Sequence, residues 1–441
     1  AVAIEDLRSA SRNGSVAIPA LRALLQRTAE EGCGRLHVLC TSRIVPPELV
    51  GLQSGLLLSL DLTEMGTEDG VSLMRRKAIR GRSDRVTRLV RKLRNHAYSI
   101  SLMSDLLRTA YRGDVRKADA VLGSGAAMDA PLKSILNWYQ GRLDEYSQTF
   151  LQAVSLFRTH VGLREIAALI PHLVTEHSSR KTKLEPALPL VAAELRSSGL
   201  LYENLDRESG VLVFAMHPLI REYFYTQITS PATFHLEAAR IIEGSVPENP
   251  DISNLEQLTL MRELIYQALG AGDVELAWRV YRERLGGYPR IGYELADHPL
   301  GTSIIEMFLE HVDALIEILP TPAIYDLFVD GALYLKNEGR LDDGITTLER
   351  LITLSRRLGR DDDRLASALL VKAGIEMLRG HISASGASIR SADDIFKASD
   401  AHIEHQASTR IARELVTRQA TLDVVRGRDA AGEFARAALM S

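Results

Sequence analysis

The chain has 441 residues, of which 46% are hydrophobic, 25% charged and only 5% aromatic, as in a globular protein rich in helix. A net charge of −4 gives no reason to expect a nucleic-acid binder. Two cysteines, Cys33 and Cys40, are too few for a disulfide framework, and we expect them to be buried or partly buried thiols. The sequence shows no signal peptide and no apolar run long enough to span a membrane, so we expect a cytoplasmic protein.

Residues 1–62 have the pattern of an α/β fold. A strand-like run at Ala1–Ile4 is followed by a helix at Ile18–Ala29 that Pro19 begins, and by candidate strands at Leu36–Cys40 and Leu56–Leu60. This order predicts half of a parallel sheet. Because the chain begins inside a strand-like run and ends inside a helical one, we expect it to be part of a longer protein.

Polar residues follow two of these strands. Glu5 and Asp6 end the first, and Thr41, Ser42 and Arg43 end the second. Ligands of parallel sheets bind at the carboxyl ends of the strands, where Asp6 with Glu5 could hold Mg²⁺ or orient a water and Arg43 could reach a γ-phosphate. Either group alone is more simply read as turn or cap residues. The two together, with a helix between them, favour a nucleotide site.

Residues 66–110 are predicted to be helical, with amphipathic helices at Glu68–Ile79 and Asp84–Leu93. Between Arg75 and Arg94 there are ten basic residues and one acid. This run is either a patch for phosphate, nucleic acid or an acidic partner, or a solvated helix face, which we favour. The small and polar segment Gly113–Ala130 has the composition of a linker.

Residues 131–225 have the pattern of a winged helix. The predicted helices are Leu132–Leu143, Tyr146–Phe157, Leu163–Leu169 and Ala187–Ser198, and the predicted hairpin strands are Leu200–Glu203 and Val211–Phe214. The helix that would read DNA offers only Arg196 as a base-reading residue. After the second strand, Met216-His217-Pro218 leads directly into a helix, with Pro218 at its first position. His217 is either a ligand-contacting residue or a loop histidine packed on Tyr223.

Beyond Pro231 the sequence is nearly all helical, and a short phrase recurs in which a glycine is followed five residues later by a small residue. It occurs at Gly272–Ala277, Gly339–Gly344, Gly380–Ser385 and Gly427–Gly432. This spacing predicts helix pairs of the tetratricopeptide type, in which glycine allows the turn and the small residue allows close packing. Gly286–Leu300 interrupts the array. His402 and His405 lie three residues apart on a helix, but with no third ligand a metal site there is not favoured.

Several of these motifs, in this order along the chain, are similar to those of a known protein family. Residues 1–225 resemble the second half of the nucleotide-binding module of the STAND signalling ATPases, which include apoptosome proteins, plant disease-resistance proteins and bacterial maltose-regulator activators. Ile4-Glu5-Asp6-Leu7 is similar to the end of the Walker B strand, and Leu39-Cys40-Thr41-Ser42-Arg43 to the sensor 1 strand. Met216-His217-Pro218 is similar to the M-H-D motif, whose histidine contacts the β-phosphate of ADP in this family.

The chain departs from the family pattern at three places. It contains no G-x-x-x-x-G-K-[ST] loop, so it cannot bind and hydrolyse a nucleotide in the usual way by itself. Asn95 and Ala97 replace the glycine and proline of the G-x-P motif that packs on adenine, and Pro218 replaces the aspartate of M-H-D.

The resemblance implies a mostly α fold with a partial α/β N-terminal part. We expect the second half of a P-loop NTPase subdomain at 1–65, a helical lid and linker at 66–130, a winged helix at 131–230 and a tetratricopeptide-like solenoid at 231–441. Glu5 and Asp6 would be catalytic, with Asp6 on the metal. Thr41, Ser42, Arg43 and His217 would contact the nucleotide. The cofactors, ADP or ATP with Mg²⁺, belong to the complete protein.

The implied function is a bacterial signal-transduction switch held off by ADP. A protein, peptide or small-molecule inducer would bind the concave face of the repeats and trigger oligomerisation. One alternative is a repeat-based scaffold or adaptor with a degenerate nucleotide module. Another is part of a maltose-regulator-like transcription activator, which would contact DNA only through a domain outside this sequence.

Overall fold

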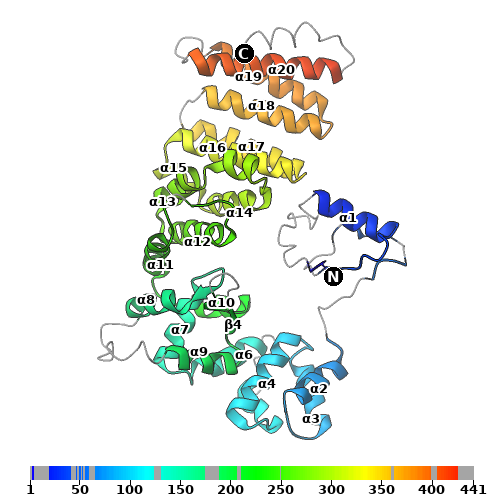
Figure 1. The fold of residues 1–441 in the computed structure, drawn as a ribbon, viewed down its shortest axis with the longest axis vertical. Coiled ribbons are helices and arrows are strands. Elements are labelled where there is room, and N and C mark those ends of the chain that lie inside the picture. The colour runs from blue at the N-terminus through cyan, green and yellow to red at the C-terminus, as the bar shows by residue number, and fades with distance from the viewer. Residues whose placement is uncertain are drawn as a thin grey trace. The chain divides into compact units, whose positions relative to one another are not determined.

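The computed structural model describes residues 2–3, 19–40, 46, 49–50, 52, 55–58, 65–123, 131–173, 188–205, 210–248, 250–358, 362–398 and 405–425. The chain forms two compact units. The first comprises Ala1–Leu58, Asn249–Asn254 and Val274–Ser441, and the second comprises Ser59–Glu248 and Leu255–Asp273. The structure is mostly helical, with one small three-stranded sheet (Figure 1). Within the described residues, no helix combines the length and apolar character needed to cross a bilayer.

The second unit begins with a group of helices that we call the N-terminal helical group. It comprises α2 (Thr67–Arg76), α3 (Ser83–Lys92), α4 (Ala97–Tyr111), the 3₁₀ turn η2 (Val115–Lys117) and α5 (Ala118–Leu122). Its core is fully buried around Met74, Val86 and Ile100. On α3 the arginines are exposed opposite the buried apolar residues, as expected for a solvated amphipathic helix. The amphipathic helices predicted at 68–79 and 84–93 are thus confirmed, with small shifts of their ends.

The linker predicted at 113–130 is wrong for residues 115–122, which form η2 and α5. Val115 and Val121 are buried there, and Ala118 packs with them. The three small apolar side chains fill a space that helices α3, α4 and α6 (Pro131–Gln140) provide, so tertiary packing orders a segment that has no strong helical pattern of its own.

The next group, which we call the helix–hairpin group, contains four helices, a small sheet and a fifth helix. Its elements are α6 (Pro131–Gln140), α7 (Glu145–Ser155), β3 (Val161–Gly162), α8 (Leu163–Leu173), α9 (Leu188–Ser197), β4 (Tyr202–Leu205), β5 (Leu212–Ala215) and α10 (Pro218–Tyr225). The sheet is antiparallel with the order β3-β5-β4. Every predicted helix and hairpin strand of this region is present within a few residues, and β3 is an addition that the sequence did not indicate.

Two long helices complete the second unit. Helix α11 (Pro231–Ser245) packs along α12 (Leu255–Ala271). Gly270 allows their close approach, because a Cβ at this position would lie 2.8 Å from ring atoms of His235. The His235 side chain is therefore enclosed between the two helices and is only 1% exposed.

In the first unit, β1 (Val2–Ala3) and β2 (Val38–Leu39) pair in parallel, with helix α1 (Pro19–Glu30) between them in the chain. This is the strand–helix–strand order that the sequence predicts. The strand predicted at 56–60 is not formed in its described part, 56–58. Leu56 and Leu58 are 60% and 79% exposed, so no neighbouring element covers an apolar face there.

The rest of the first unit is an array of helices. They are α13 (Val274–Arg279), α14 (His298–Leu309), α15 (Val312–Ile318), α16 (Thr321–Asn337), α17 (Leu341–Leu358), α18 (Asp362–Leu378), α19 (Ile382–Ala398) and α20 (His405–Val425). Helices α16 and α17 form one pair and α18 and α19 the next, and α18 lies between α16 and α20 (Figure 1). This arrangement is the tetratricopeptide-like stacking that the repeated phrase predicts.

The repeated glycines make the turns of this array. Gly272, Gly339 and Gly380 have φ values of 79°, 78° and 86°, in the left-handed region where glycine is favoured. The small residues five positions later, Ala277, Gly344 and Ser385, are buried at the helix contacts. The prediction is confirmed at these three positions, and the fourth, Gly427–Gly432, lies outside the described residues.

The predicted interruption at Gly286–Leu300 contains one π-helical segment, η6 (Pro289–Glu294), and a second, η5 (Val280–Arg284), lies just before it. They surround Asp330 of α16, which is 8% exposed. The Tyr281 hydroxyl donates to Asp330 Oδ2 at 2.8 Å, and the Tyr288 backbone N–H points to the same oxygen at 3.4 Å. Wide π turns thus bring two tyrosines to one buried carboxyl.

Candidate functional site

Only one of the residues predicted to contact a nucleotide is described. Glu5, Asp6, Thr41, Ser42 and Arg43 lie outside the described residues, so their roles stay predictions. His217 is described, and it is the starting point for the site. Among the described residues there is no group of three or more His, Cys, Asp or Glu side chains that could hold a metal ion. His402 and the side chain of His405 also lie outside them.

His217 is the N-cap of α10, between β5 and Pro218. Its Nδ1 accepts a hydrogen bond from the Leu219 backbone N–H at 3.3 Å, which satisfies one of the first amide groups of the helix. Because Nδ1 is the acceptor, the neutral ring carries its proton on Nε2. The strand-to-helix joint therefore fixes both the position and the tautomer of this imidazole.

The ring of His217 stacks on Tyr98 of α4. The ring centroids are 3.8 Å apart and the planes differ by 11°. Burial, with a smaller contribution from the neighbouring Tyr202, raises the pKa of Tyr98 well above its usual range, so the phenol stays protonated. The stack joins the helix–hairpin group to the N-terminal helical group. The alternative expectation was a His217 ring packed on Tyr223. The ring stacks on Tyr98, and the Tyr223 hydroxyl bonds to Asn137 and Gln140 on α6.

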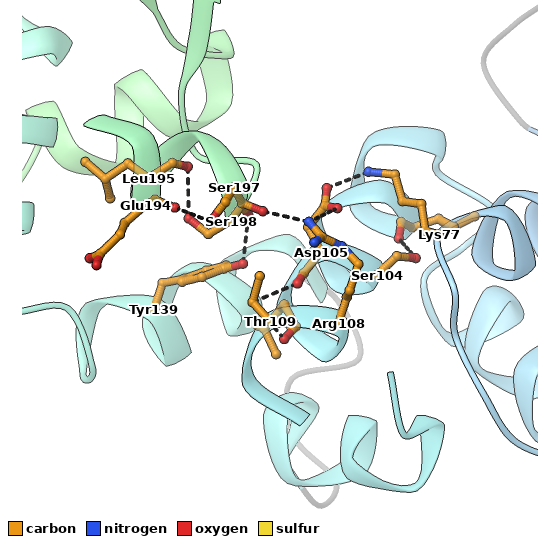
Figure 2. Close-up of polar contacts among 12 residues, drawn as sticks. Lys77, Ser104, Asp105, Arg108, Thr109, Tyr139, Glu194, Leu195, Ser197 and Ser198 are labelled. Atoms are coloured by element: carbon orange, nitrogen blue, oxygen red, sulfur yellow. Dashed lines mark hydrogen bonds and ion pairs between the residues drawn. The ribbon is translucent and has the colours of Figure 1, made fainter. Parts of the chain in front are cut away.

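Arg108 of the same helix, beside the carboxylate of Asp105, makes a second link between the two groups (Figure 2). Asp105 of α4 accepts from Lys77 Nζ at 2.5 Å and from Arg108 at 3.4 Å. Arg108 also donates to the Ser197 carbonyl at 2.8 Å, at the end of α9, where a cation is favourable to the helix dipole. Tyr139 donates to the adjacent Ser198 carbonyl at 2.9 Å. The end of α9 is thus held by side chains from α4 and α6.

Gly199 lets the backbone after α9 pass close to the Asp105 side chain. Gly199 has a φ of 77°, and a Cβ there would lie 2.9 Å from Asp105 Oδ2. Both the backbone conformation and the close approach therefore disfavour any other residue.

A cleft of about 580 Å³ lies between α2 and α4 on one side and α9 and β4 on the other. The charged side chains that line it are Lys77, Asp105, Arg108, Arg196 and Glu203, and Tyr98 and Tyr202 add aromatic surface. Arg196 pairs with Glu203 across the cleft wall. Three cations face two carboxylates, so the lining carries one excess positive charge, which suits an anionic ligand.

Asparagine in place of Asp105 should lower the free energy of unfolding of the second unit by about 2 kcal/mol. The side chain is 12% exposed, and its replacement leaves Lys77 and Arg108 without their counter-charge. Asp119→Asn is the matched control, since its pair with Lys92 is exposed and worth at most about 1 kcal/mol. Urea unfolding of both variants measures the difference, and equal losses would contradict the role of Asp105.

A buried chain of hydrogen bonds joins the helix–hairpin group to α11 and α12. His235 Nδ1 lies 2.6 Å from Gln267 Oε1, and His235 Nε2 lies 2.9 Å from the Tyr225 hydroxyl. Gln267 Nε2 donates to the Leu156 carbonyl at 2.9 Å and to Glu263 at 2.8 Å. Tyr225 belongs to α10 and Leu156 follows α7, so the chain reaches two separate elements of the helix–hairpin group.

The direction of each bond in this chain follows from the donors and acceptors present. The Gln267 amide nitrogen has two acceptors, so its oxygen faces His235, whose Nδ1 must carry the proton. His235 Nε2 then accepts from the Tyr225 hydroxyl. Burial lowers the pKa of His235, which keeps the ring in this neutral form.

Glu263 lies at the end of the chain and is 3% exposed. Besides Gln267, the Arg158 backbone N–H donates to it at 3.2 Å and the Thr159 hydroxyl at 3.3 Å. Burial raises its pKa, and these donors oppose that effect. The loop after α7 is therefore fastened to α12 at three points.

The sequence indicated His217 but not its partners. Asp105 had a signal, since it is the only acid within the apolar run Ile100–Leu107 and a buried acid needs a partner. Nothing in the sequence identified Lys77 as the partner of Asp105 or Tyr98 as the partner of His217. These contacts form only when α2, α4 and β5 pack together.

Comparison with known proteins gives a distant likeness to solved structures. No protein-family model and no curated protein matches the sequence. Among solved structures, the chain is similar to a Signal Transduction ATPase with Numerous Domains (STAND) protein with a tetratricopeptide repeat sensor from Pyrococcus horikoshii. The identity is 13% and the TM-score 0.36, and the match covers 88% of this chain and 62% of that one. The chain thus spans less than two thirds of that protein, and a likeness at this level does not show membership of its family.

Proposed function

We propose that the chain is the regulatory part of a nucleotide-dependent signal-transduction switch. The observation that supports this best is the stack of His217 on Tyr98. It joins the two groups that the sequence predicts to be a helical lid and a winged helix, at the residue that resembles the ADP-contacting histidine. In the proposed off state, the stack and the bond from Arg108 to the Ser197 carbonyl hold these groups together around the nucleotide.

The buried chain from Tyr225 to Glu263 supports the second part of the proposal. His217 caps the start of helix α10 and Tyr225 ends it, so one short helix connects the stack to the buried chain. A change in α11 and α12 would therefore reach His217 through rigid, hydrogen-bonded elements. The array would act as the sensor, with a protein, peptide or small-molecule inducer, and oligomerisation of the complete protein would follow opening.

Alanine in place of His217, made in the complete protein that contains this chain, should reduce the ADP retained through purification. The expected weakening is about tenfold or more, which corresponds to the loss of one charge-assisted hydrogen bond of about 1.5 kcal/mol. ADP is released by denaturation and measured by chromatography. His172→Ala is the control, since this exposed histidine at the end of α8 lies in the same group. Equal ADP retention in wild type and His217→Ala would contradict the proposal.

A scaffold or adaptor remains the second candidate, and one observation favours it. Where the related ATPases have a proline against adenine, this chain caps α4, with His96 Nδ1 accepting from the Ser99 backbone N–H at 3.3 Å. Asn95 there has a φ of 54°. A complete protein that retains neither ADP nor ATP on purification would support the scaffold over the switch.

A further inference from the structure

The cleft in the second unit is lined on one side by a single face of helix α4. Tyr98, Ser101, Asp105 and Arg108 follow one another at intervals of three or four residues, so they lie along one side of this helix. The opposite wall consists of the end of α9, the turn after it and the start of β4. A volume of about 580 Å³ is within the range of sites for small molecules.

Two cations in this cleft keep unused donor groups. Lys77 and Arg108 bond to different oxygens of Asp105 (Figure 2). The bonds of Arg108 to Asp105 and to the Ser197 carbonyl both come from Nη2, so its Nε and Nη1 have no partner among the described residues. Lys77 uses only one of the three hydrogens of its ammonium group. Asp105 thus positions both cations without using up their capacity to donate.

Ser101 adds a third donor to the same face of α4. Ser104 and Thr109 of this helix donate to carbonyls one turn earlier, at 2.6 Å and 2.8 Å. The Ser101 hydroxyl makes no such bond within the described part of the chain, and the side chain lines the cleft. Its hydroxyl is therefore available to a ligand.

The cleft also offers apolar surface. Tyr202 of β4 is 47% exposed, and it lines the cleft together with Leu102 and Leu201, which are almost fully buried. An apolar group inside the cleft can pack on the exposed ring of Tyr202.

We propose that this cleft binds a small organic carboxylate with an apolar body. The carboxylate would accept from Lys77, Arg108 and Ser101. The body would pack on Tyr202, so the ligand would contact both the N-terminal helical group and the helix–hairpin group.

Charge selects a carboxylate over a phosphate. The lining holds three cations and two carboxylates, so one negative charge makes the site neutral, whereas a phosphate monoester dianion or ADP would bring a surplus. His217 is not among the residues that line the cleft. The ligand is therefore a second one, distinct from the nucleotide, and the inference goes beyond the proposed switch.

Calorimetric titration of the whole chain with matched probes tests this inference. 3-Phenylpropionate carries the carboxylate and the apolar body, 3-phenylpropionamide lacks the charge, acetate lacks the body, and phenyl phosphate carries a second charge. At pH 8 and constant ionic strength, 3-phenylpropionate should bind more tightly than the other three. Its advantage over the amide should be about tenfold, because the amide forms no charge-assisted hydrogen bond as an acceptor.

Two substitutions should move the affinity for 3-phenylpropionate in opposite directions. Arg108→Gln removes a cation but can still donate to the Ser197 carbonyl, and it should weaken binding about tenfold. Glu203→Gln removes a negative charge from the lining and should tighten binding about threefold. A misfolded variant could not bind more tightly, so this gain separates charge from stability. Arg116→Gln is the control and should bind as wild type does, since Arg116 pairs with Asp114 outside the cleft.

Equal binding of the acid and the amide, tighter binding of phenyl phosphate, or an unchanged affinity in either Arg108→Gln or Glu203→Gln would overturn the carboxylate site. Acetate that binds as tightly as 3-phenylpropionate would overturn the role of Tyr202. ADP that competes with 3-phenylpropionate would assign the cleft to the nucleotide and overturn the second ligand. The other titrations contain no nucleotide, so their failure leaves the ADP switch, which is tested through His217, unaffected.

Discussion

Replacing Gln267 with leucine is expected to lower the free energy of unfolding of the second unit by about 4 kcal/mol, since each buried polar group left unpaired costs about 1 to 3 kcal/mol. Leucine has a similar volume but neither donates nor accepts. The replacement leaves the His235 N–H and the Leu156 carbonyl without partners and removes one donor from Glu263. Gln267 is fully buried, so water cannot take the place of its amide.

Chemical unfolding followed by circular dichroism measures the loss, with Gln257→Leu as control. Gln257 lies near the start of the same helix and is only partly buried, so its replacement should cost less than about 1 kcal/mol. A loss in Gln267→Leu as small as in the control would show that the buried chain contributes little.

Hydrogen exchange distinguishes a local from a connected effect of this substitution. The bonds from Gln267 reach the Leu156 carbonyl, and those from Glu263 reach the Arg158 N–H, in the loop after α7. If α12 holds this loop, Gln267→Leu should speed amide exchange in residues 156–160 and in α10 as well as in α12. Faster exchange confined to α12 would show that the helix–hairpin group does not depend on it.

The periodicity of the sequence predicted most of the helices, because each amphipathic pattern is local. Helices α9 and α10 and strand β5 occur where the pattern of apolar residues and Pro218 places them. The glycine turns at Gly339 and Gly380 were equally readable, since a left-handed φ needs glycine whatever surrounds it. Failures occurred where a segment depends on its neighbours, as in the exposed 56–58 segment and the packed 115–122 segment.

The candidate site was less predictable than the fold for the same reason. His217 was found because a histidine between a strand and Pro218 is a local feature. Tyr98 lies more than a hundred residues earlier in the chain, and no pattern near it indicates an aromatic partner. Gln267 and His235 also gave no signal, because a single polar residue in an apolar helix does not show what it bonds to. Long-range contacts of this kind require the tertiary structure.

Asparagine in place of Asp330 is expected to stabilise the first unit at pH 8 by up to about 3 kcal/mol. Burial raises the pKa of Asp330 from 3.8 to about 6, against the opposing hydrogen bonds from Tyr281 and Tyr288 and the charge of Arg282. Each pKa unit corresponds to about 1.4 kcal/mol, so ionising this carboxyl in the folded state costs about 3 kcal/mol. Asparagine can still accept from the Tyr281 hydroxyl but carries no charge.

The pH dependence gives this prediction a distinctive sign. Between about pH 4 and pH 6 the folded state keeps the proton on Asp330 while the unfolded chain releases it, so the contribution of this group to stability falls as the pH rises through that range and is constant above it. Asp330→Asn should therefore gain stability at pH 8 and little or none at pH 4. Asp326→Asn, one turn earlier on α16, is the control, since Asp326 is paired with Arg282 and Arg364 and its loss should not stabilise. A destabilised Asp330→Asn at pH 8 would mean that the bond from Tyr281 to a full negative charge outweighs the cost of burying that charge between the two π segments.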